Sequence, residues 1–135
     1  MKQKVLFICT NNSARSQIAE GFLNNLFKNN YEAFSAGTQQ SSLNPYTVEV
    51  MKEVGIDISN YRSKSIEEFK NHKFDFVITV CDNAKDTCPF FSGKKVIHKS
   101  FEDPAAFEGN IEDTLNEFRK IRDEIKNWLI IEFDE

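Results

Sequence analysis

The sequence predicts an α/β domain in which a parallel β-sheet is covered by helices on both faces. Short, continuous apolar runs alternate along the chain with longer segments whose apolar residues recur at helical spacing. Such runs indicate strands buried on both faces, and helices between them are typical of parallel pairing. With 135 residues, 40% of them hydrophobic, the chain is long enough for one core, so we expect a single domain over residues 1–135.

The first part of the chain predicts a strand, a helix and a second strand. Residues 5–8 form a short apolar run, and a polar turn over residues 10–13 follows. From Ala14 to about Lys28 the apolar residues recur at helical spacing. Residues 31–36 then predict a strand that ends at Gly37.

The middle of the chain predicts two helices and the strongest strand. Asn44 is a capping residue and Pro45 suits the first helical position, so a helix is expected to begin there and to stop at Gly55. Ser65 and Glu68 resemble a capping box that opens a short helix. The strand is predicted over residues 74–80, which are rich in β-branched and aromatic side chains.

The last part predicts a weaker fourth strand over residues 96–98 and a helix from about residue 111 to residue 131. The apolar stripe of this helix consists of Leu115, Phe118, Ile121, Ile125, Trp128 and Leu129. Ligands of such folds bind beyond the carboxyl ends of the strands. Because Cys9 and Cys81 each follow a strand, we expect both at this edge.

The charge balance excludes some classes of partner. Seventeen basic and 21 acidic residues give a net charge of -4, which argues against nucleic acids and anionic membranes but not against a small anion. No segment has the roughly 20 apolar residues of a membrane span, and a secretory signal is not visible. We therefore expect a cytoplasmic protein, and nothing suggests more than a monomer.

Cysteine usage argues against structural disulfides and against zinc. Three cysteines in a cytoplasmic chain do not indicate a disulfide framework, and the chain has neither a CxxC pair nor paired histidine ligands. We expect His72 and His98 to be surface or packing residues, and no metal site. Buried, unreactive thiols remain an alternative for all three cysteines.

The turn between the first strand and the following helix contains the residues that most strongly indicate a reaction. Cys9 and Arg15 place a thiol and a guanidinium six positions apart across this turn. Backbone N–H groups in such a turn, together with the positive helix N-terminus, form a cradle for a tetrahedral oxyanion. Arg15 can bind two of its oxygens, and the same field should lower the pKa of the Cys9 thiol. Ser16 is a further donor to the sulfur, and Asn12 a brace. The predicted cradle comprises Thr10, Asn11, Asn12, Ser13, Ala14, Arg15 and Ser16.

Two other features belong to the same predicted edge. Asp103 and its neighbour Glu102 follow the fourth strand, in a loop expected at this edge, and an oxygen leaves more readily when a carboxyl group protonates it. Taken alone, Asp-Pro is an ordinary turn signal, and these residues by themselves do not choose between the two carboxyl groups. Cys81 and Cys88 are separated by about two helical turns, so a disulfide between them requires this segment to bend or unwind. They remain open to interpretation as two incidental thiols.

The C-x5-R-S pattern resembles low-molecular-weight protein tyrosine phosphatases and the arsenate reductases that share their fold. The resemblance to thioredoxin-coupled arsenate reductases covers nearly the whole chain and implies a four-stranded parallel sheet, arsenate as substrate, thioredoxin as reductant and no cofactor. Its motifs are the Cys9 loop, Ser35-Ala36-Gly37, Asn44-Pro45, Asp57-Ile58-Ser59, Cys81 to Cys88-Pro89, Asp103-Pro104 and Arg122-Asp123-Glu124-Ile125.

The resemblance also implies the order of events. Cys9 attacks arsenate while Asp103 protonates the departing oxygen. Cys81 then attacks Cys9 as arsenite leaves, and Cys88 attacks Cys81 to form the disulfide that thioredoxin reduces.

This chain departs from the family at a potassium site that some members form with positions matching Asn12, Glu20 and Ser35. Here Arg62 and Lys64 occupy the segment that completes the site. Two cations would repel a metal ion, and the Lys64 ammonium could take its place, so we expect no potassium dependence. The alternative is that both side chains are solvated.

Two other functions remain open. A phosphatase would use Cys9, Arg15 and Asp103 without the other cysteines, although Ala105 and Ala106, where phosphatases usually carry aromatic residues, favour a small inorganic substrate. A non-catalytic anion-binding or redox-sensing module would need no turnover.

Overall fold

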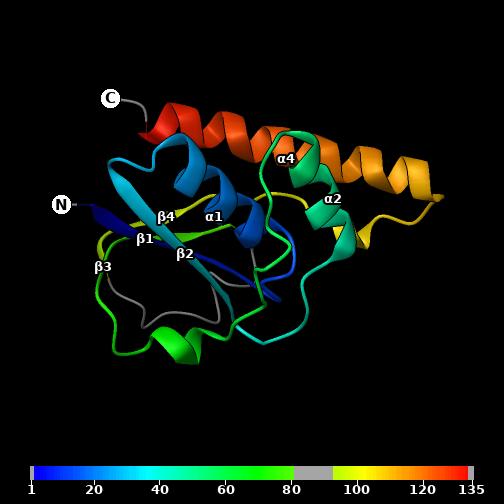
Figure 1. The fold of residues 1–135 in the computed structure, drawn as a ribbon. Coiled ribbons are helices and arrows are strands. Elements are labelled where there is room, and N and C mark those ends of the chain that lie inside the picture. The colour runs from blue at the N-terminus through cyan, green and yellow to red at the C-terminus, as the bar shows by residue number, and fades with distance from the viewer. Residues whose placement is uncertain (1, 81–92, 134–135) are drawn as a thin grey trace.

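In the computed structural model, which describes residues 2–80 and 93–133, four parallel strands form one sheet in the order β2-β1-β3-β4 (Figure 1). The strands are β1 (Gln3–Cys9), β2 (Tyr31–Gly37), β3 (Phe74–Thr79) and β4 (Gly93–His98). The predicted parallel sheet is therefore confirmed.

The position of each strand in the sheet explains its sequence. β1 pairs with both β2 and β3, and its residues Val5 to Ile8 are fully buried. β4 lies at an edge and begins at Gly93, three residues before the predicted start. Its exposed residues, such as Lys95 and Val96, lack the continuous apolar run that marks a central strand.

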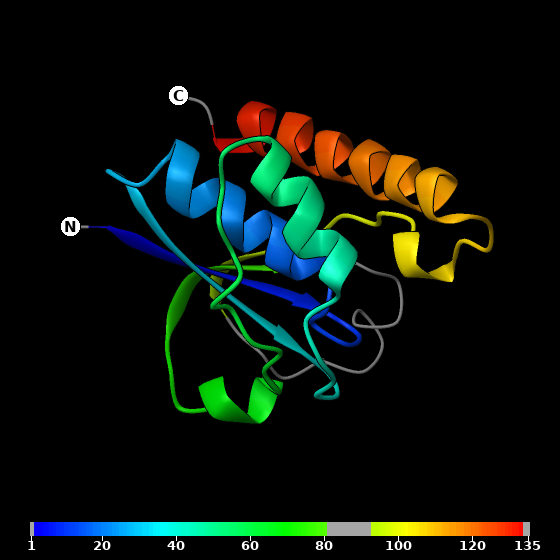
Figure 2. The same cartoon turned by 45° about the vertical axis from the view of Figure 1, so that its right-hand side comes forward.

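Of the described residues, three α-helices lie together over one face of the sheet (Figures 1 and 2). They are α1 (Arg15–Leu26), α2 (Pro45–Glu53) and α4 (Ile111–Phe133). As predicted, α2 is capped by Asn44, whose side chain accepts from Tyr46 N at 2.8 Å, and the chain turns at Gly55 with φ of 81°.

On the other face, the described part of the chain places a 3₁₀ turn, η1 (Ile66–Phe69). Neighbouring strand residues point to opposite faces. Accordingly, Ser35 of β2 donates to Glu20 of α1, while the ring of Phe34 lies 5.9 Å from that of Phe69 in η1. The fold therefore has helical segments on both faces.

The capping box predicted at η1 is only half formed. Ser65 Oγ accepts from Glu67 N at 3.2 Å, as a capping residue should. Glu68, however, accepts from Arg62 and not from the start of the turn. The short helix is thus a 3₁₀ turn with one side-chain cap.

The ends of β1 and β3 meet at one edge of the sheet. Val80 N donates to Ile8 O at 2.9 Å, so the chain leaves β3 beside the end of β1. The apolar stripe of α4 packs into the core as predicted, and the Trp128 ring lies 6.2 Å from that of Phe101. Among the described helices, none is long and apolar enough to cross a membrane.

Candidate active site

The loop between β1 and α1 is held from outside through its carbonyl groups. The oxygens of residues 9–13 each accept a hydrogen bond from a group beyond the loop. The donors are Thr38 N to Cys9, Gln39 N to Thr10, Ser63 Oγ to Asn11, Gln17 Nε2 to Asn12, and both Asn44 N and Thr47 Oγ1 to Ser13, over 2.8 to 3.1 Å.

These outward carbonyls determine the direction of the N–H groups. In a trans peptide the C=O and the following N–H point in opposite directions, and the described residues contain no cis peptide. The N–H groups of residues 10–14 are thereby turned inward. The Asn12 N–H shows where they point, since it donates to Cys9 Sγ at 3.2 Å. Successive inward N–H groups form a cradle for an oxyanion.

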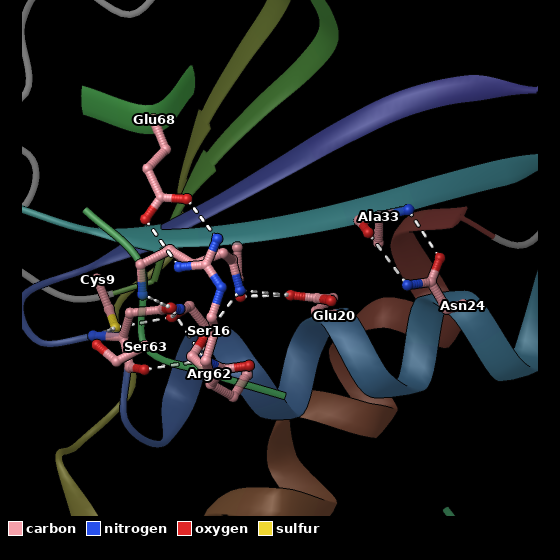
Figure 3. Close-up of polar contacts among 12 residues, drawn as sticks. Cys9, Ser16, Glu20, Asn24, Ala33, Arg62, Ser63 and Glu68 are labelled. Carbon is pink, nitrogen blue, oxygen red and sulfur yellow. Dashed lines mark hydrogen bonds and ion pairs between the residues drawn. The ribbon is translucent and has the colours of Figure 1, made fainter. Parts of the chain in front are cut away.

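The Cys9 sulfur is buried and has a second contact with Ser16 Oγ at 2.9 Å (Figure 3). Ser16 and Asn12 thus lie where the sequence placed them. A thiolate is an acceptor, so a hydroxyl and an N–H donor at the sulfur both favour the charged nucleophile.

Asn12 determines the direction of the Ser16 proton. The backbone N–H of Lys64 can only donate, and it donates to Asn12 Oδ1 at 2.8 Å. The amide nitrogen of Asn12 therefore faces Ser16 Oγ, 2.7 Å away, and donates to it. Because Ser16 accepts this bond, its own proton is available to Cys9. Asn12 itself has φ of 52°, a left-handed conformation that asparagine tolerates.

Arg15, in the first turn of α1, contacts the loop after β4. Its Nη1 donates to Phe101 O at 3.1 Å, and its Nη2 lies 3.5 Å from Asp103 Oδ2. The other Asp103 oxygen accepts from Ala105 N and begins the short turn η2 (Pro104–Ala106). Asp103 is therefore at the predicted edge, whereas Glu102 is exposed and the carboxylate paired with Arg15 is that of Asp103.

The residues at the expected potassium position do not fit a metal ion. Lys64 Nζ lies 3.7 Å from Glu20 Oε1 and donates to Arg62 O, and the side chains of Lys64 and Glu20 are each only 13% exposed. Burial raises the pKa of Glu20, which Lys64 and Ser35 partly offset. Burial also lowers the pKa of Lys64, partly offset by Glu20. A half-buried ammonium thus lies beside the carboxylate that a cation would need.

The alternative of two solvated cations is wrong for Lys64 and correct for Arg62. The Arg62 side chain is 63% exposed, and its guanidinium turns to Glu68, with Nη2 2.6 Å from Oε1 (Figure 3). Arg62 thus pairs with Glu68 and not with Glu20, but its charge still reaches Lys64 and adds to the burial that lowers the pKa of this ammonium. Only the Lys64 ammonium reaches Glu20 in the described part of the chain.

Other predicted residues have varied outcomes. His72 packs against the rings of Phe69 and Phe74, and His98 is exposed with Nδ1 near Thr79 Oγ1, as expected for packing and surface residues. Cys81 and Cys88 lie outside the described residues. Three side chains that donate to carbonyl oxygens of the loop were not predicted, because no sequence pattern marks them. They are Gln17, Thr47 and Ser63.

Comparison with known proteins gives the family. The sequence profile of the low molecular weight phosphotyrosine protein phosphatases matches residues 4–131. Arsenate reductases of Halalkalibacterium halodurans and Bacillus subtilis are each 42% identical, over 92% and 96% of this chain and 90% and 94% of their own lengths. The chain belongs to the low molecular weight phosphotyrosine protein phosphatase family, in its arsenate reductase branch.

Solved structures of family members agree with the fold. An arsenate reductase in a phosphate-binding state is 35% identical, with a TM-score of 0.82 over 96% of this chain and 94% of that one. A low molecular weight protein tyrosine phosphatase from T. tengcongensis is 30% identical, with a TM-score of 0.80 over 97% and 99%. A thioredoxin-dependent arsenate reductase of Corynebacterium glutamicum is 29% identical, with a TM-score of 0.71 over 99% of this chain and 64% of that one.

Proposed function

We propose that this chain reduces arsenate to arsenite in a thioredoxin-dependent reaction. The observation that carries the proposal is a buried thiol with two donors on its sulfur, within a loop whose N–H groups are turned inward. The similarity to arsenate reductases along nearly the whole chain favours arsenate as the oxyanion. A related arsenate reductase that binds phosphate supports the same kind of ligand for this loop.

In the first step Cys9 is the nucleophile. The inward N–H groups and Arg15 hold the arsenate oxygens, and the Cys9 thiolate attacks arsenic. One oxygen departs as water after it receives a proton from Asp103. The Asp103 carboxylate is paired with Arg15, whose Nη2 lies 3.5 Å from Oδ2. An As–S bond has formed and an As–O bond has broken.

The second step reduces arsenic. The Cys81 thiolate attacks the Cys9 sulfur, and the electron pair of the As–S bond passes to arsenic, which leaves as arsenite. Cys88 then attacks Cys81 and releases the Cys9 thiolate, and two thiols of thioredoxin reduce the Cys81–Cys88 disulfide. The thioredoxin-dependent relative supports this donor.

The remaining expectations form part of the same proposal. Residues 1–135 act as one domain and as a monomer in the cytoplasm, with neither a metal ion nor another cofactor. Gel filtration of the purified chain would check the monomer.

The decisive experiment follows NADPH consumption with arsenate, thioredoxin and thioredoxin reductase, together with the arsenite formed. We expect one arsenite for each NADPH over many turnovers. Cys88→Ser and Cys81→Ser should each abolish the turnover. A chain that forms an oxidisable cysteine pair without continued arsenite production would instead be a redox-sensing module.

Phosphatase activity is the second candidate, favoured by the match to the T. tengcongensis phosphatase and by a site that has the nucleophile, arginine and acid which phosphate-ester cleavage needs. It has no use for Cys81 or Cys88. Hydrolysis of para-nitrophenyl phosphate should therefore survive both serine variants. If the unmodified chain cleaves the ester efficiently but fails to reduce arsenate, the phosphatase is the better answer.

A further inference from the structure

We propose that Thr47 and Ser63 are positioning residues of the oxyanion loop with separate targets: Thr47 directs the Ala14 N–H to the oxyanion, and Ser63 directs the Asn12 N–H to the Cys9 sulfur. The inference rests on the proposed use of the loop as an oxyanion site. Neither side chain belongs to the loop, since Thr47 lies in α2 and Ser63 in the segment between α2 and η1.

Thr47 acts on the peptide that joins Ser13 to Ala14. Its side chain is fully buried, and its hydroxyl donates to Ser13 O at 3.1 Å. The N–H of Asn44 donates to the same oxygen, also at 3.1 Å. With the carbonyl held toward α2, the Ala14 N–H of the same planar unit points the opposite way, into the cradle.

Ala14 also packs into a small cluster that holds this side of the loop. Its partners are Val50 of α2 and Phe118 of α4, and all three residues are buried. α2 therefore contacts the loop twice, through the Thr47 hydroxyl and through this apolar cluster. Both contacts lie at the C-terminal end of the loop, at Ser13 and Ala14, just before α1 begins.

Ser63 acts on a different peptide, the one that joins Asn11 to Asn12. Ser63 is 4% exposed, and its hydroxyl donates to Asn11 O at 2.8 Å. Its oxygen accepts from Ser41 N at 2.9 Å, which fixes the hydroxyl between two backbone groups. The N–H at the other end of the held peptide is the one that donates to Cys9 Sγ.

The two anchors therefore predict different losses. Without the Thr47 hydroxyl, the Ala14 N–H is less well directed and the oxyanion loses part of a donor, while the sulfur keeps both of its donors. Without the Ser63 hydroxyl, the Asn12 N–H is free to turn from the sulfur, and the thiolate is less stable. A general loosening of the loop would affect both properties together.

The Thr47 test uses Thr47→Val, which keeps the shape of the side chain and removes the donor, and Thr47→Ser, which keeps the donor. Inorganic phosphate binding is measured by calorimetry. We expect Thr47→Val to bind phosphate about three- to tenfold more weakly, the effect of one neutral hydrogen bond, and Thr47→Ser to bind like the unmodified chain. Thr114→Val is the matched control, because it removes a hydroxyl that donates to the Asn110 carbonyl far from the loop.

The Ser63 test follows alkylation of Cys9 by iodoacetamide against pH, with the Cys9 peptide identified by mass spectrometry. Ser63→Ala should move the midpoint of alkylation to higher pH, and it should weaken phosphate binding less than Thr47→Val does. In Thr47→Val the midpoint should stay where it is. Thr47→Ala provides a second variant should the valine variant not fold.

Unchanged phosphate binding in folded Thr47→Val and Thr47→Ala would overturn the inference. So would equal shifts of both properties in the Thr47 and Ser63 variants. Failure of the proposed function is distinct from either result, because it would appear as a lack of arsenite formation by the unmodified chain, whereas these tests measure phosphate binding and Cys9 alkylation.

Discussion

The amide nitrogen of Asn12 lies 2.7 Å from the hydroxyl oxygen of Ser16, which lies 2.9 Å from the Cys9 sulfur. Both Asn12 and Ser16 are fully buried. The direction of each bond follows from the Lys64 N–H, which can only donate and which holds the Asn12 oxygen. The backbone N–H of Lys64, in a distant segment, thus orients the Ser16 hydroxyl so that it donates a hydrogen bond to the Cys9 sulfur.

This relay predicts that the Asn12 amide is needed as a donor. In Asn12→Asp a carboxylate would accept the Ser16 proton, so the sulfur would lose its hydroxyl donor and face a new negative charge. We expect the pH midpoint of Cys9 alkylation to rise, and Ser16→Ala to raise it less because no charge is added. Asn11→Asp is the control, since the Asn11 side chain contacts Gln39 and not Ser16. An equal rise in the control would show a charge effect alone.

Asp103 is predicted to act as the acid in the first step. Asp103→Asn keeps the shape of the side chain but cannot supply the proton, so arsenate turnover should fall by about 10²- to 10⁴-fold. Glu102→Gln, a change at the exposed neighbour, should have little effect. The measurement is the initial rate of arsenite formation at saturating thioredoxin. If the glutamine variant loses the greater part of the activity, the roles of the two carboxylates are reversed.

The Lys64–Glu20 pair is predicted to stabilise the fold only as a pair. Lys64→Met leaves the buried Glu20 carboxylate without its ammonium and should cost stability toward the lower end of roughly 3–5 kcal/mol, since both side chains keep some exposure. Adding Glu20→Gln should recover most of that loss. Lys94→Met removes an exposed partner of Asp75 and should change stability by less than about 1 kcal/mol. Urea unfolding of the four proteins measures all of these effects.

The same pair predicts that potassium does not activate the enzyme. Because the Lys64 ammonium already balances the charge of the Glu20 carboxylate, a potassium ion would gain little attraction there. Arsenate turnover in potassium chloride should therefore equal that in choline chloride at constant ionic strength. A clear rise with potassium would contradict the assignment of this position to Lys64.

Glu53 is predicted to contribute to the pH dependence of stability. Hydrogen bonds from Arg119, and also from Arg122, hold its pKa below the ordinary value of 4.5. The folded state therefore keeps this carboxylate charged at lower pH than the unfolded state does. Its stabilising effect is complete above about pH 4.5 and is lost as the pH falls through the lowered pKa.

Unfolding of Glu53→Gln tests this effect. The variant should be less stable than the unmodified chain at pH 6, and the difference should narrow toward pH 3. Glu49→Gln, an exposed change on the same helix, should show no such trend. A difference that stays constant with pH would mean that the carboxylate charge is not the cause.

The alternation of strands and helices could be predicted because each central element carries its own signal. The buried run of β1 and the Asn44 cap of α2 are local features, and the loop after β1 follows from strand, turn and helix in succession. The edge strand β4 was placed too late because an exposed strand has no continuous apolar run. The pairing of Ser65 with Glu68 failed because Arg62, six residues before Glu68, binds that carboxylate.

The sequence by itself determined the sheet, the oxyanion loop with Cys9 and Arg15, and the family. Each of these is indicated by short motifs whose residues are neighbours in the sequence. Only the tertiary structure decided which side chains hold the loop. Thr47 and Ser63 lie more than thirty residues beyond Cys9, and short hydroxyl side chains of this kind occur throughout the chain. Their roles follow from the packing of α2 and the segment after it against the loop, where a buried carbonyl must find a donor.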